Sequence, residues 1–199
     1  MTDSNDKKWT TLESRYVVRR PWLTARCERV QLPTGAVHDE YYVLEYPTWV
    51  NIIARDENGR FIMVEQYRHG LGEVFTELCA GIAEEGEDPE TAARRELAEE
   101  TGYTGGRWRL LSVISANPST QTNLTYCFVA EGVRKTQSQQ LDATEDLSVK
   151  LLTQEDIAGM LARDEIKQSL MATPLLKYLF ETQLQQLADG ESTSSKSSK

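Results

Sequence analysis

The 199 residues suit one domain, or one domain with an added subdomain. The formal net charge of −9 argues against nonspecific nucleic-acid binding, because that activity needs a basic face to displace counterions. The same charge is compatible with a phosphate-bearing ligand, since bound divalent cations can invert the local sign of the electrostatic potential.

The cysteines indicate the redox state that we expect. Cys27, Cys79 and Cys127 stand far apart and have no CxxC spacing, which argues against structural zinc and a disulfide framework. Reduced thiols in a cytoplasmic protein are the interpretation that fits best. The polar N-terminus has no apolar segment typical of a signal peptide, and no apolar run approaches the roughly 18 residues of a membrane span. We therefore expect no membrane partner.

Composition divides the chain into four parts. Residues 1–7 and the Ser-rich residues 189–199 are polar, which predicts disordered ends. Residues 8–46 predict an antiparallel β subdomain, and residues 47–188 predict the main domain. We therefore expect a main domain with a β segment appended to it.

Turn residues and hydrophobic periods predict the elements. Asn58-Gly59 suits the two positive φ values of a type I′ hairpin turn. Asp88 can cap a helix, Pro89 fits its first position, and Gly102 can end it. Strands on both sides of this central helix, with more helix at the end, predict an α/β fold with a mixed sheet sandwiched between helices. The predicted strands are Trp22–Leu32, Val37–Tyr46, Thr48–Arg55, Phe61–Tyr67, Glu73–Leu78, Trp108–Ile114, Leu124–Ala130 and Leu147–Leu152, and the other helices are Gln154–Arg163 and Leu170–Leu187.

Three carboxylates share one face of the predicted central helix. Glu96, Glu99 and Glu100 stand at positions i, i+3 and i+4, so they cover an arc of about 100°. Carboxylates held this close repel one another, and hard cations such as Mg²⁺ restore the balance because they prefer oxygen ligands. The alternative is a solvated acidic helix face, which is what most charge runs are.

The surroundings of this cluster resemble the Nudix signature. That signature is a Gly, five residues, a Glu, seven residues, Arg-Glu, an apolar residue, any residue, Glu-Glu, any residue, a Gly and an aliphatic residue. The one departure in this chain is Tyr103 at the aliphatic position. The matching residues are Gly81, Glu87, Arg95, Glu96, Leu97, Glu99, Glu100 and Gly102. The resemblance implies a Nudix hydrolase with the Nudix fold.

The resemblance also implies a metal site. The cofactor would be Mg²⁺, with Mn²⁺ as the alternative. Glu87 would assist the metal site and pair with Arg95, for which a free surface cation is the alternative. Gly81 would let the backbone approach the metals. The implied metal ligands are Ala80 through its carbonyl, Glu87, Glu96, Glu99, Glu100 and Glu145.

Segments outside the signature resemble the ADP-ribose pyrophosphatase branch. Gln66–Arg68 and Glu77–Gly81 look like its strand and the loop that leads to the signature. Pro118 lies sixteen residues beyond Gly102, as in that branch. Three features depart from the branch. Cys79 stands where members usually have Pro, Ser119 stands where they usually have Gly, and Gln121 or Thr122 replaces a nearby acidic residue.

Three residues are candidates for binding substrate or for catalysis. Arg68 would clamp a phosphate or carboxylate, or it is an edge-strand Arg paired with an acid. Glu77 would bind a base or ribose, or brace the loop. Glu145 would bind an additional metal ion or act as general base, or it is a plain surface acid, and Asp142 and Asp146 are its rivals.

The aromatic residues of the β subdomain point to assembly. In the branch that the chain resembles, this region exchanges across a dimer, and its aromatics stack on the nucleobase. We therefore expect a homodimer in which Trp9 and Tyr41 stack on the base or else pack in the core or interface. His38 and His69 show no metal-ligand spacing. We expect His69 to be a surface residue, and contact with a phosphate is its alternative.

These observations predict Mg²⁺-dependent hydrolysis of the pyrophosphate bond of a nucleoside diphosphate sugar. The first candidate substrate is ADP-ribose, which would give AMP and ribose 5-phosphate. Cys79 and the altered segment after Pro118 motivate the alternative of GDP-mannose or another nucleotide sugar. A non-catalytic nucleotide-sugar sensor is an alternative of a different class, and the intact carboxylate set favours catalysis over it.

Overall fold

A computed structural model describes the backbone of residues 7–194 and the side chains of residues 7–188. The chain forms two compact units. The first holds the described residues up to Thr48 together with Ser115–Leu124, and the second holds Trp49–Ile114 and the chain from Thr125 onward. Most of the predicted disordered lead, residues 1–6, and the last part of the predicted tail, residues 195–199, lie outside the described residues.

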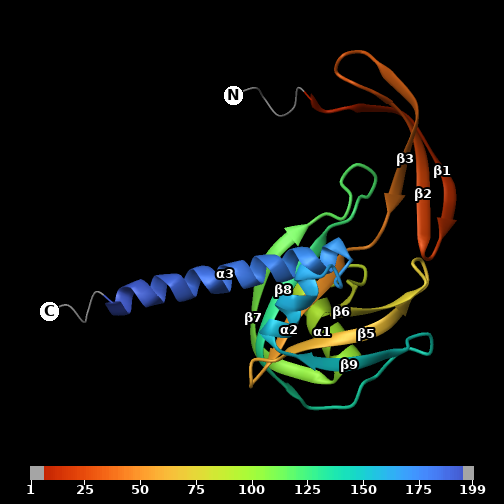
Figure 1. The fold of residues 1–199 in the computed structure, drawn as a ribbon. Helices are drawn as coiled ribbons and strands as arrows, with labels where there is room; N and C mark the ends of the chain where they lie inside the picture. The colour runs from red at the N-terminus through yellow and green to blue at the C-terminus, as the bar shows by residue number, and fades with distance from the viewer. Residues whose placement is uncertain (1–6, 195–199) are drawn as a thin grey trace. The chain divides into compact units, whose positions relative to one another are not determined.

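The first unit is built on a three-stranded antiparallel sheet in the order β1-β2-β3 (Figure 1). The sequence pattern predicted two of these strands and assigned none before Trp22. Every residue of the additional strand, β1, is exposed, so an alternation of buried and exposed residues could not reveal it. The strands are β1 (Thr10–Arg20), β2 (Leu23–Gln31) and β3 (Val37–Glu45).

The second unit is built on a six-stranded mixed sheet in the order β7-β8-β4-β6-β5-β9. The central pair β4–β8 is parallel, and the other neighbours are antiparallel. The strands are β4 (Trp49–Asp56), β5 (Phe61–Arg68), β6 (Glu73–Ile82), β7 (Tyr103–Ile114), β8 (Thr125–Lys135) and β9 (Leu147–Leu152). The predicted α/β fold with a mixed sheet is confirmed.

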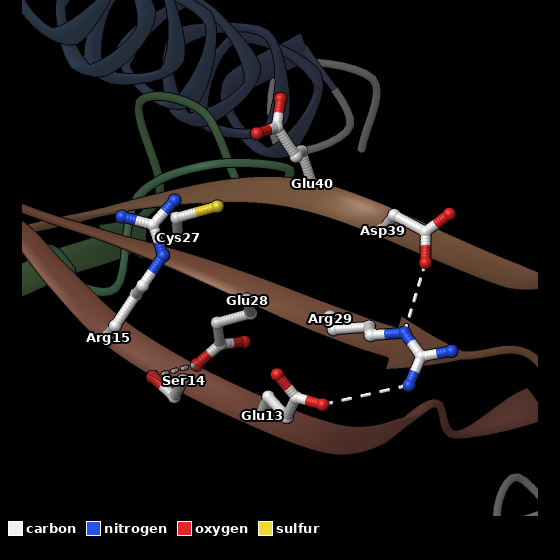
Figure 2. A pocket seen from close by; sticks show the side chains of 8 residues that line it. All are labelled: Glu13, Ser14, Arg15, Cys27, Glu28, Arg29, Asp39 and Glu40. Carbon is white, nitrogen blue, oxygen red and sulfur yellow. Dashed lines mark hydrogen bonds and ion pairs between the residues drawn. The ribbon is translucent and has the colours of Figure 1, made fainter.

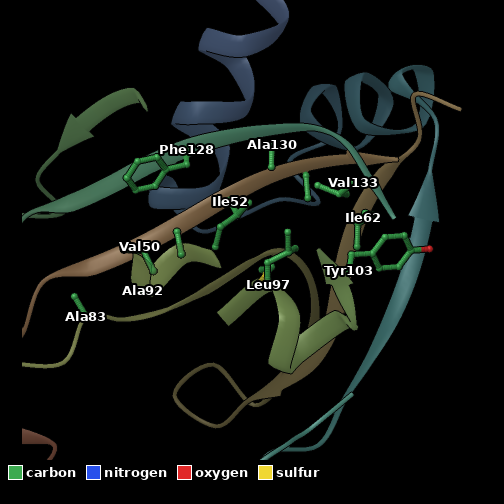
Figure 3. Packing of buried hydrophobic residues seen from close by; sticks show 13 residues of the cluster. Val50, Ile52, Ile62, Ala83, Ala92, Leu97, Tyr103, Phe128, Ala130 and Val133 are labelled. Carbon is green, nitrogen blue, oxygen red and sulfur yellow. The ribbon is translucent and has the colours of Figure 1, made fainter. Parts of the chain in front are cut away.

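Helices cover both faces of this sheet (Figure 1). Alternation along β4 sends Val50 and Ile52 to one face, where they pack with Ala92 and Leu97 of α1 (Figure 3). Ile53 points to the opposite face, where its cluster includes residues of the other two helices. The helices are α1 (Pro89–Thr101), α2 (Gln154–Ala162) and α3 (Ser169–Ser194).

The predicted signals at the ends of α1 are present. The Asp88 carboxylate accepts hydrogen bonds from the backbone N–H groups of Glu90 and Thr91, each at 3.1 Å. Gly102 ends the helix in the left-handed conformation, with φ of 75°, and its N–H donates to the Ala98 carbonyl. Because both ends are fixed, the acidic face of α1 has a defined register against the sheet.

Two local predictions were wrong. The hairpin after β4 is not type I′: Gly59 is left-handed at φ 78°, whereas Asn58 has negative φ. The Asp56 carboxylate accepts from the N–H groups of Asn58 and Arg60 and so closes a different turn. The segment up to Gly81 is not a loop, because β6 continues through it to Ile82.

The last helix is longer than predicted. It runs to Ser194, past Leu187 where the hydrophobic pattern ended, so α3 continues into the segment expected to be a mobile tail. Within the described residues, no helix combines the length and apolarity needed to cross a membrane.

Candidate active site

Helix α1 places two of its acids directly against strand β6. Glu100 is only 5% exposed, and its Oε2 accepts a hydrogen bond from the Ala80 N–H at 3.2 Å. Glu96 lies against Gly81, where an added Cβ would overlap the carboxylate carbon. Gly81 is therefore required for close approach of strand and helix, and the absence of a side chain makes room for Glu96.

Arg95 links the acids of the signature. Its Nη1 donates to Glu96 Oε1 at 2.9 Å and to Glu99 Oε2 at 3.0 Å. Its Nε and Nη2 donate to the two oxygens of Glu87, at 3.2 and 3.0 Å, and Nη2 also donates to the Ile82 carbonyl. The predicted pairing of Glu87 with Arg95 is present, so Arg95 is not a free surface cation.

Burial and mutual repulsion raise the pKa values of Glu96 and Glu100, which are the inner acids of the site. Desolvation raises the pKa of Glu100 to about 7, and the charges of Glu96 and Glu145 add to the effect. Desolvation also raises the pKa of Glu96. In contrast, the hydrogen bonds from Arg95 lower the pKa of Glu87. The inner acids therefore form a site that a positive charge would stabilise.

The donor set fits a hard divalent cation. Carboxylate oxygens and the Ala80 carbonyl are the ligand types that such cations prefer, and Gly81 leaves space beside Glu96. As the side chains stand, no three His, Cys, Asp or Glu groups of the described residues are arranged to hold a metal. Instead, the Arg95 guanidinium forms ion pairs with one oxygen of Glu96 and one oxygen of Glu99. A cation bound here would replace Arg95 as the partner of these carboxylate oxygens.

Glu145 joins this acidic group from a distant part of the chain. It stands in the turn before β9, where its backbone N–H donates to the Asp142 carbonyl and its carboxylate accepts from the Asp142 N–H, both at 2.9 Å. The Glu145 charge is close enough to raise the pKa of both Glu96 and Glu100. The three acids are thus electrostatically coupled, although the role of Glu145 stays a prediction.

Arg68 and Glu77 form an ion pair. Both Nε and Nη2 of Arg68 donate to Glu77 Oε2, at 3.0 and 2.6 Å, and the Gln66 amide donates to the same oxygen at 3.1 Å. Glu77 is 3% exposed, whereas the Arg68 side chain is 44% exposed. A buried carboxylate therefore fixes a cation that remains accessible to a ligand.

A cavity of about 350 Å³ opens beside this pair. Lys167 borders it, with Nζ 2.9 Å from Glu73 Oε2 and 5.7 Å from the Phe75 ring centroid. Sequence reasoning missed Lys167 and Phe75, because they belong to no motif and only the fold brings them together. The cavity is lined by Arg68, His69, Gly70, Leu71, Phe75, Glu77, Lys167 and Gln168.

The predicted base-stacking residues belong to the first unit. Trp9 stacks on His38 with centroids 5.5 Å apart and meets Tyr41 edge-on at 5.7 Å. The Tyr41 hydroxyl donates to the Ser119 carbonyl. His38 is thus part of an aromatic cluster, which the sequence did not indicate. Stacking of Trp9 or Tyr41 on a base stays a prediction.

A second hollow, of about 140 Å³, lies on the N-terminal sheet (Figure 2). Arg29 bridges Glu13 at 3.6 Å and Asp39 at 3.0 Å across it. Four acids and two arginines surround the hollow, so its excess negative charge disfavours an anionic substrate. The cavity beside Arg68 is the better candidate for a phosphate-bearing ligand.

Comparison with known families identifies the signature. The description "NUDIX domain" matches residues 45–172, which include both α1 and β6. The chain belongs to the Nudix family. A second description, "Nucleoside diphosphate sugar hydrolase N-terminal domain", matches residues 9–44, which carry the three-stranded sheet of this Nudix protein.

Relatives of this Nudix hydrolase include two bacterial ADP-ribose pyrophosphatases. The Bacillus subtilis protein is 32% identical over 70% of this chain and 75% of its own length. The Mycobacterium tuberculosis protein is 31% identical over 76% of this chain and 73% of its own length. A crystal structure described as an ADP compounds hydrolase superposes with a TM-score of 0.73 at 21% identity, covering 88% of this chain and 96% of the other. That structure supports the fold.

Proposed function

We propose that this Nudix hydrolase cleaves the pyrophosphate bond of a nucleoside diphosphate sugar in a Mg²⁺-dependent reaction. The first candidate substrate is ADP-ribose, which would yield AMP and ribose 5-phosphate. The observation that carries the proposal is the group of buried acids on α1 beside an anchored, accessible Arg68. The match of the N-terminal unit to a nucleoside diphosphate sugar hydrolase domain supports the substrate class.

Strand β6 connects the acids to the cavity. Glu77, Cys79 and Gly81 alternate along the strand, so their positions share the face that α1 covers. Glu77 holds Arg68 at the cavity, and Gly81 receives Glu96. One strand therefore contacts both Arg68, through Glu77, and Glu96, through Gly81, and these two strand positions are about 13 Å apart along the strand axis at 3.3 Å per residue.

Different residues of the chain would bind the cation and the substrate in the proposed reaction. Glu96, Glu99 and Glu100, with the Ala80 carbonyl and Glu87, would hold the cation. When bound, the cation neutralises phosphate oxygens and lowers the pKa of a water molecule. Arg68 would bind a phosphate and fix the substrate in line, which supplies the positioning part of the rate enhancement.

Two further groups would support the chemistry. Glu145 lies on a turn near the inner acids and would accept a proton from the attacking water, or add a ligand to a further cation. Arg95 would compensate the acids before the cation binds, because it already donates to Glu96 and Glu99. No serine or cysteine nucleophile is required by this arrangement.

We also propose a homodimer formed through the N-terminal sheet. The support is the exposure of large apolar side chains there: Trp22 is 83% exposed and Tyr16 50% exposed. Such residues are stabilised by burial against another surface, and two-fold pairing is the commonest assembly. Trp9 and Tyr41 would then be available to stack on a base.

The test is product release from ADP-ribose and from GDP-mannose, each with Mg²⁺, with Mn²⁺ and with a chelator. We expect AMP and ribose 5-phosphate from ADP-ribose only when a divalent cation is present, and faster turnover than with GDP-mannose. Faster GDP-mannose hydrolysis would contradict the substrate assignment. Tight binding of ADP-ribose without turnover under every condition would favour a sensor and contradict hydrolysis.

A further inference from the structure

Strand β6 carries two acids that anchor cations beside one cavity. Glu73, Phe75 and Glu77 occupy alternate positions of the strand, so they share one face of the sheet. Glu77 holds Arg68, whose Nη2 lies 2.6 Å from Glu77 Oε2. Glu73 accepts a hydrogen bond from the Lys167 Nζ at 2.9 Å. Both cations line the cavity of about 350 Å³, so two anchored positive charges border one hollow.

The pairing of β5 with β6 brings the two cations towards each other. Arg68 stands directly opposite Glu73 in the antiparallel hairpin, and its guanidinium reaches along β6 to the carboxylate of Glu77. Lys167 comes from the segment between α2 and α3, and its Nζ lies 5.7 Å from the centroid of the Phe75 ring. The Phe75 position therefore lies between the anchors of the two cations, and its ring attracts the lysine.

Lys167 gives the cavity lining its net positive charge. The charged residues of the lining are Arg68, Lys167 and Glu77, with His69 counted as neutral. Arg68 and Glu77 form an ion pair, so their formal charges cancel. A phosphate group that enters the cavity is therefore attracted by the charge of Lys167, in addition to the local donors of Arg68.

Both cations keep hydrogen-bond donors for a ligand. Nε and Nη2 of Arg68 donate to Glu77, whereas its Nη1 has no acceptor among the residues that the structure describes. The Lys167 ammonium has three donors and uses one of them on Glu73. A phosphate group has several acceptor oxygens and can accept from a planar guanidinium and from an ammonium at the same time.

We propose that Lys167 is a second ligand-binding cation, which binds one phosphate group in this cavity together with Arg68, and that Glu73 holds the lysine until that phosphate displaces it. The inference rests on the proposed function, because that phosphate group would belong to the substrate. The side chains of Lys167 and Glu73 are 52% and 56% exposed, so their ion pair contributes little to stability and is readily exchanged. Arg68 keeps its position, because its partner Glu77 is buried.

The chain offers a matched control. Lys150 also forms an ion pair with an acid, Glu65, and its side chain is 42% exposed, but it lies outside the cavity lining. Lys150→Met and Lys167→Met therefore remove the same charge from two comparable ion pairs. Lys167→Arg retains the charge, and Glu73→Gln removes the charge of the acid that competes with the ligand.

The first measurement is calorimetric binding of inorganic phosphate at low ionic strength, with a chelator present so that the acids of α1 hold no cation. We expect Lys167→Met to weaken binding by about tenfold or more, because a charge-assisted hydrogen bond is lost. Lys167→Arg should recover most of that loss, and Lys150→Met should bind as wild type. Glu73→Gln should tighten binding by up to about fivefold, since the exposed ion pair no longer competes.

The second measurement is steady-state hydrolysis of ADP-ribose at saturating Mg²⁺. We expect Lys167→Met to raise KM by about tenfold or more and to change kcat little, because a contact made equally in the ground state and the transition state acts on KM. The effect of Glu73→Gln on phosphate binding should vanish when Lys167→Met is also present, because the two side chains act as a pair.

Wild-type phosphate affinity in Lys167→Met, or an equal loss in Lys150→Met, would overturn the inference. Tighter phosphate binding in Glu73→Gln that persists without Lys167 would overturn the role of Glu73. If phosphate binding depends on Lys167 but the wild-type protein hydrolyses neither ADP-ribose nor GDP-mannose, the proposed function fails and the phosphate site stands.

Discussion

Glu100 shows at the scale of one residue how a buried carboxylate opposes stability. The folded chain buries this carboxylate and raises its pKa from the ordinary value of a glutamate to about 7. The unfolded chain leaves it near its ordinary value of about 4.3. Without a cation, the folded state therefore binds a proton more tightly than the unfolded state. Stability from this group is present at low pH and is lost as pH rises through about 7.

The substitution Glu100→Gln tests this opposition. In the presence of a chelator at pH 8, we expect the variant to be more stable than wild type, by up to about 3 kcal/mol from the pKa shift. Turnover should fall at least about a hundredfold, because a cation ligand is lost. Urea unfolding at pH 5 and pH 8 measures the first effect, and steady-state kinetics measure the second.

The two pH values supply the control for this prediction. At pH 5 the wild-type carboxyl is largely protonated in the folded metal-free chain but largely ionised in the unfolded chain, so the stability gain of the variant should shrink to about 1 kcal/mol. An equal stability gain at both pH values would mean that relief of charge is not the cause. Near wild-type turnover would refute the assignment of Glu100 as a ligand.

At the scale of elements, the sequence predicted those with local signals. Helix α1 was predictable because Asp88, Pro89 and Gly102 each act within one turn of its ends. Strands β4 and β5 were predictable because their buried residues are apolar and their turn carries Asn58-Gly59, although Asp56 decides the turn type. Strand β1 was missed because no face of it is buried within the chain.

The residues of the candidate site were predictable where they lie on one helix. They were not predictable where residues of several elements come into contact. The spacing of Glu96, Glu99 and Glu100 defines their common face. The contact of the Ala80 N–H with Glu100 and the approach of Lys167 to Phe75 depend on pairing between distant segments, for which a single sequence carries no signal. Arg68 was predicted as either a ligand clamp or a partner of an acid, and the structure shows the second contact.

Gly81→Ala tests the fit of β6 against α1. The added Cβ would overlap the Glu96 carboxylate, so we expect that side chain to be displaced and turnover to fall at least about a hundredfold. Gly159→Ala on α2 is the control, because its Cβ meets only the flexible end of Arg163, and Ala favours a helix. Kinetics at saturating Mg²⁺ and thermal unfolding distinguish a lost site from a lost fold. Wild-type turnover in Gly81→Ala would contradict the close approach.

At the scale of the whole molecule, two units carry different parts of the proposed function. The second unit contains the acids, Arg68 and the cavity beside it. The first unit contains the aromatic cluster of Trp9, His38 and Tyr41, and a sheet with exposed apolar residues. Every residue of β1 in this three-stranded sheet is exposed, and a small sheet needs a hydrophobic face packed on another surface for independent stability. Association through this sheet would supply the missing burial.

The proposed homodimer is tested by solution mass. Light scattering at micromolar concentration should give twice the 22.6 kDa chain mass for wild type. The double substitution Tyr16→Glu with Trp22→Glu places charges on two side chains that are 50% and 83% exposed, and we expect it to lower the mass towards the monomer. Leu176→Glu changes an equally apolar, 56% exposed residue of α3 and should leave the mass unchanged. A monomeric wild type with full activity would refute a shared assembly, and loss of the dimer only in Leu176→Glu would move the interface to α3.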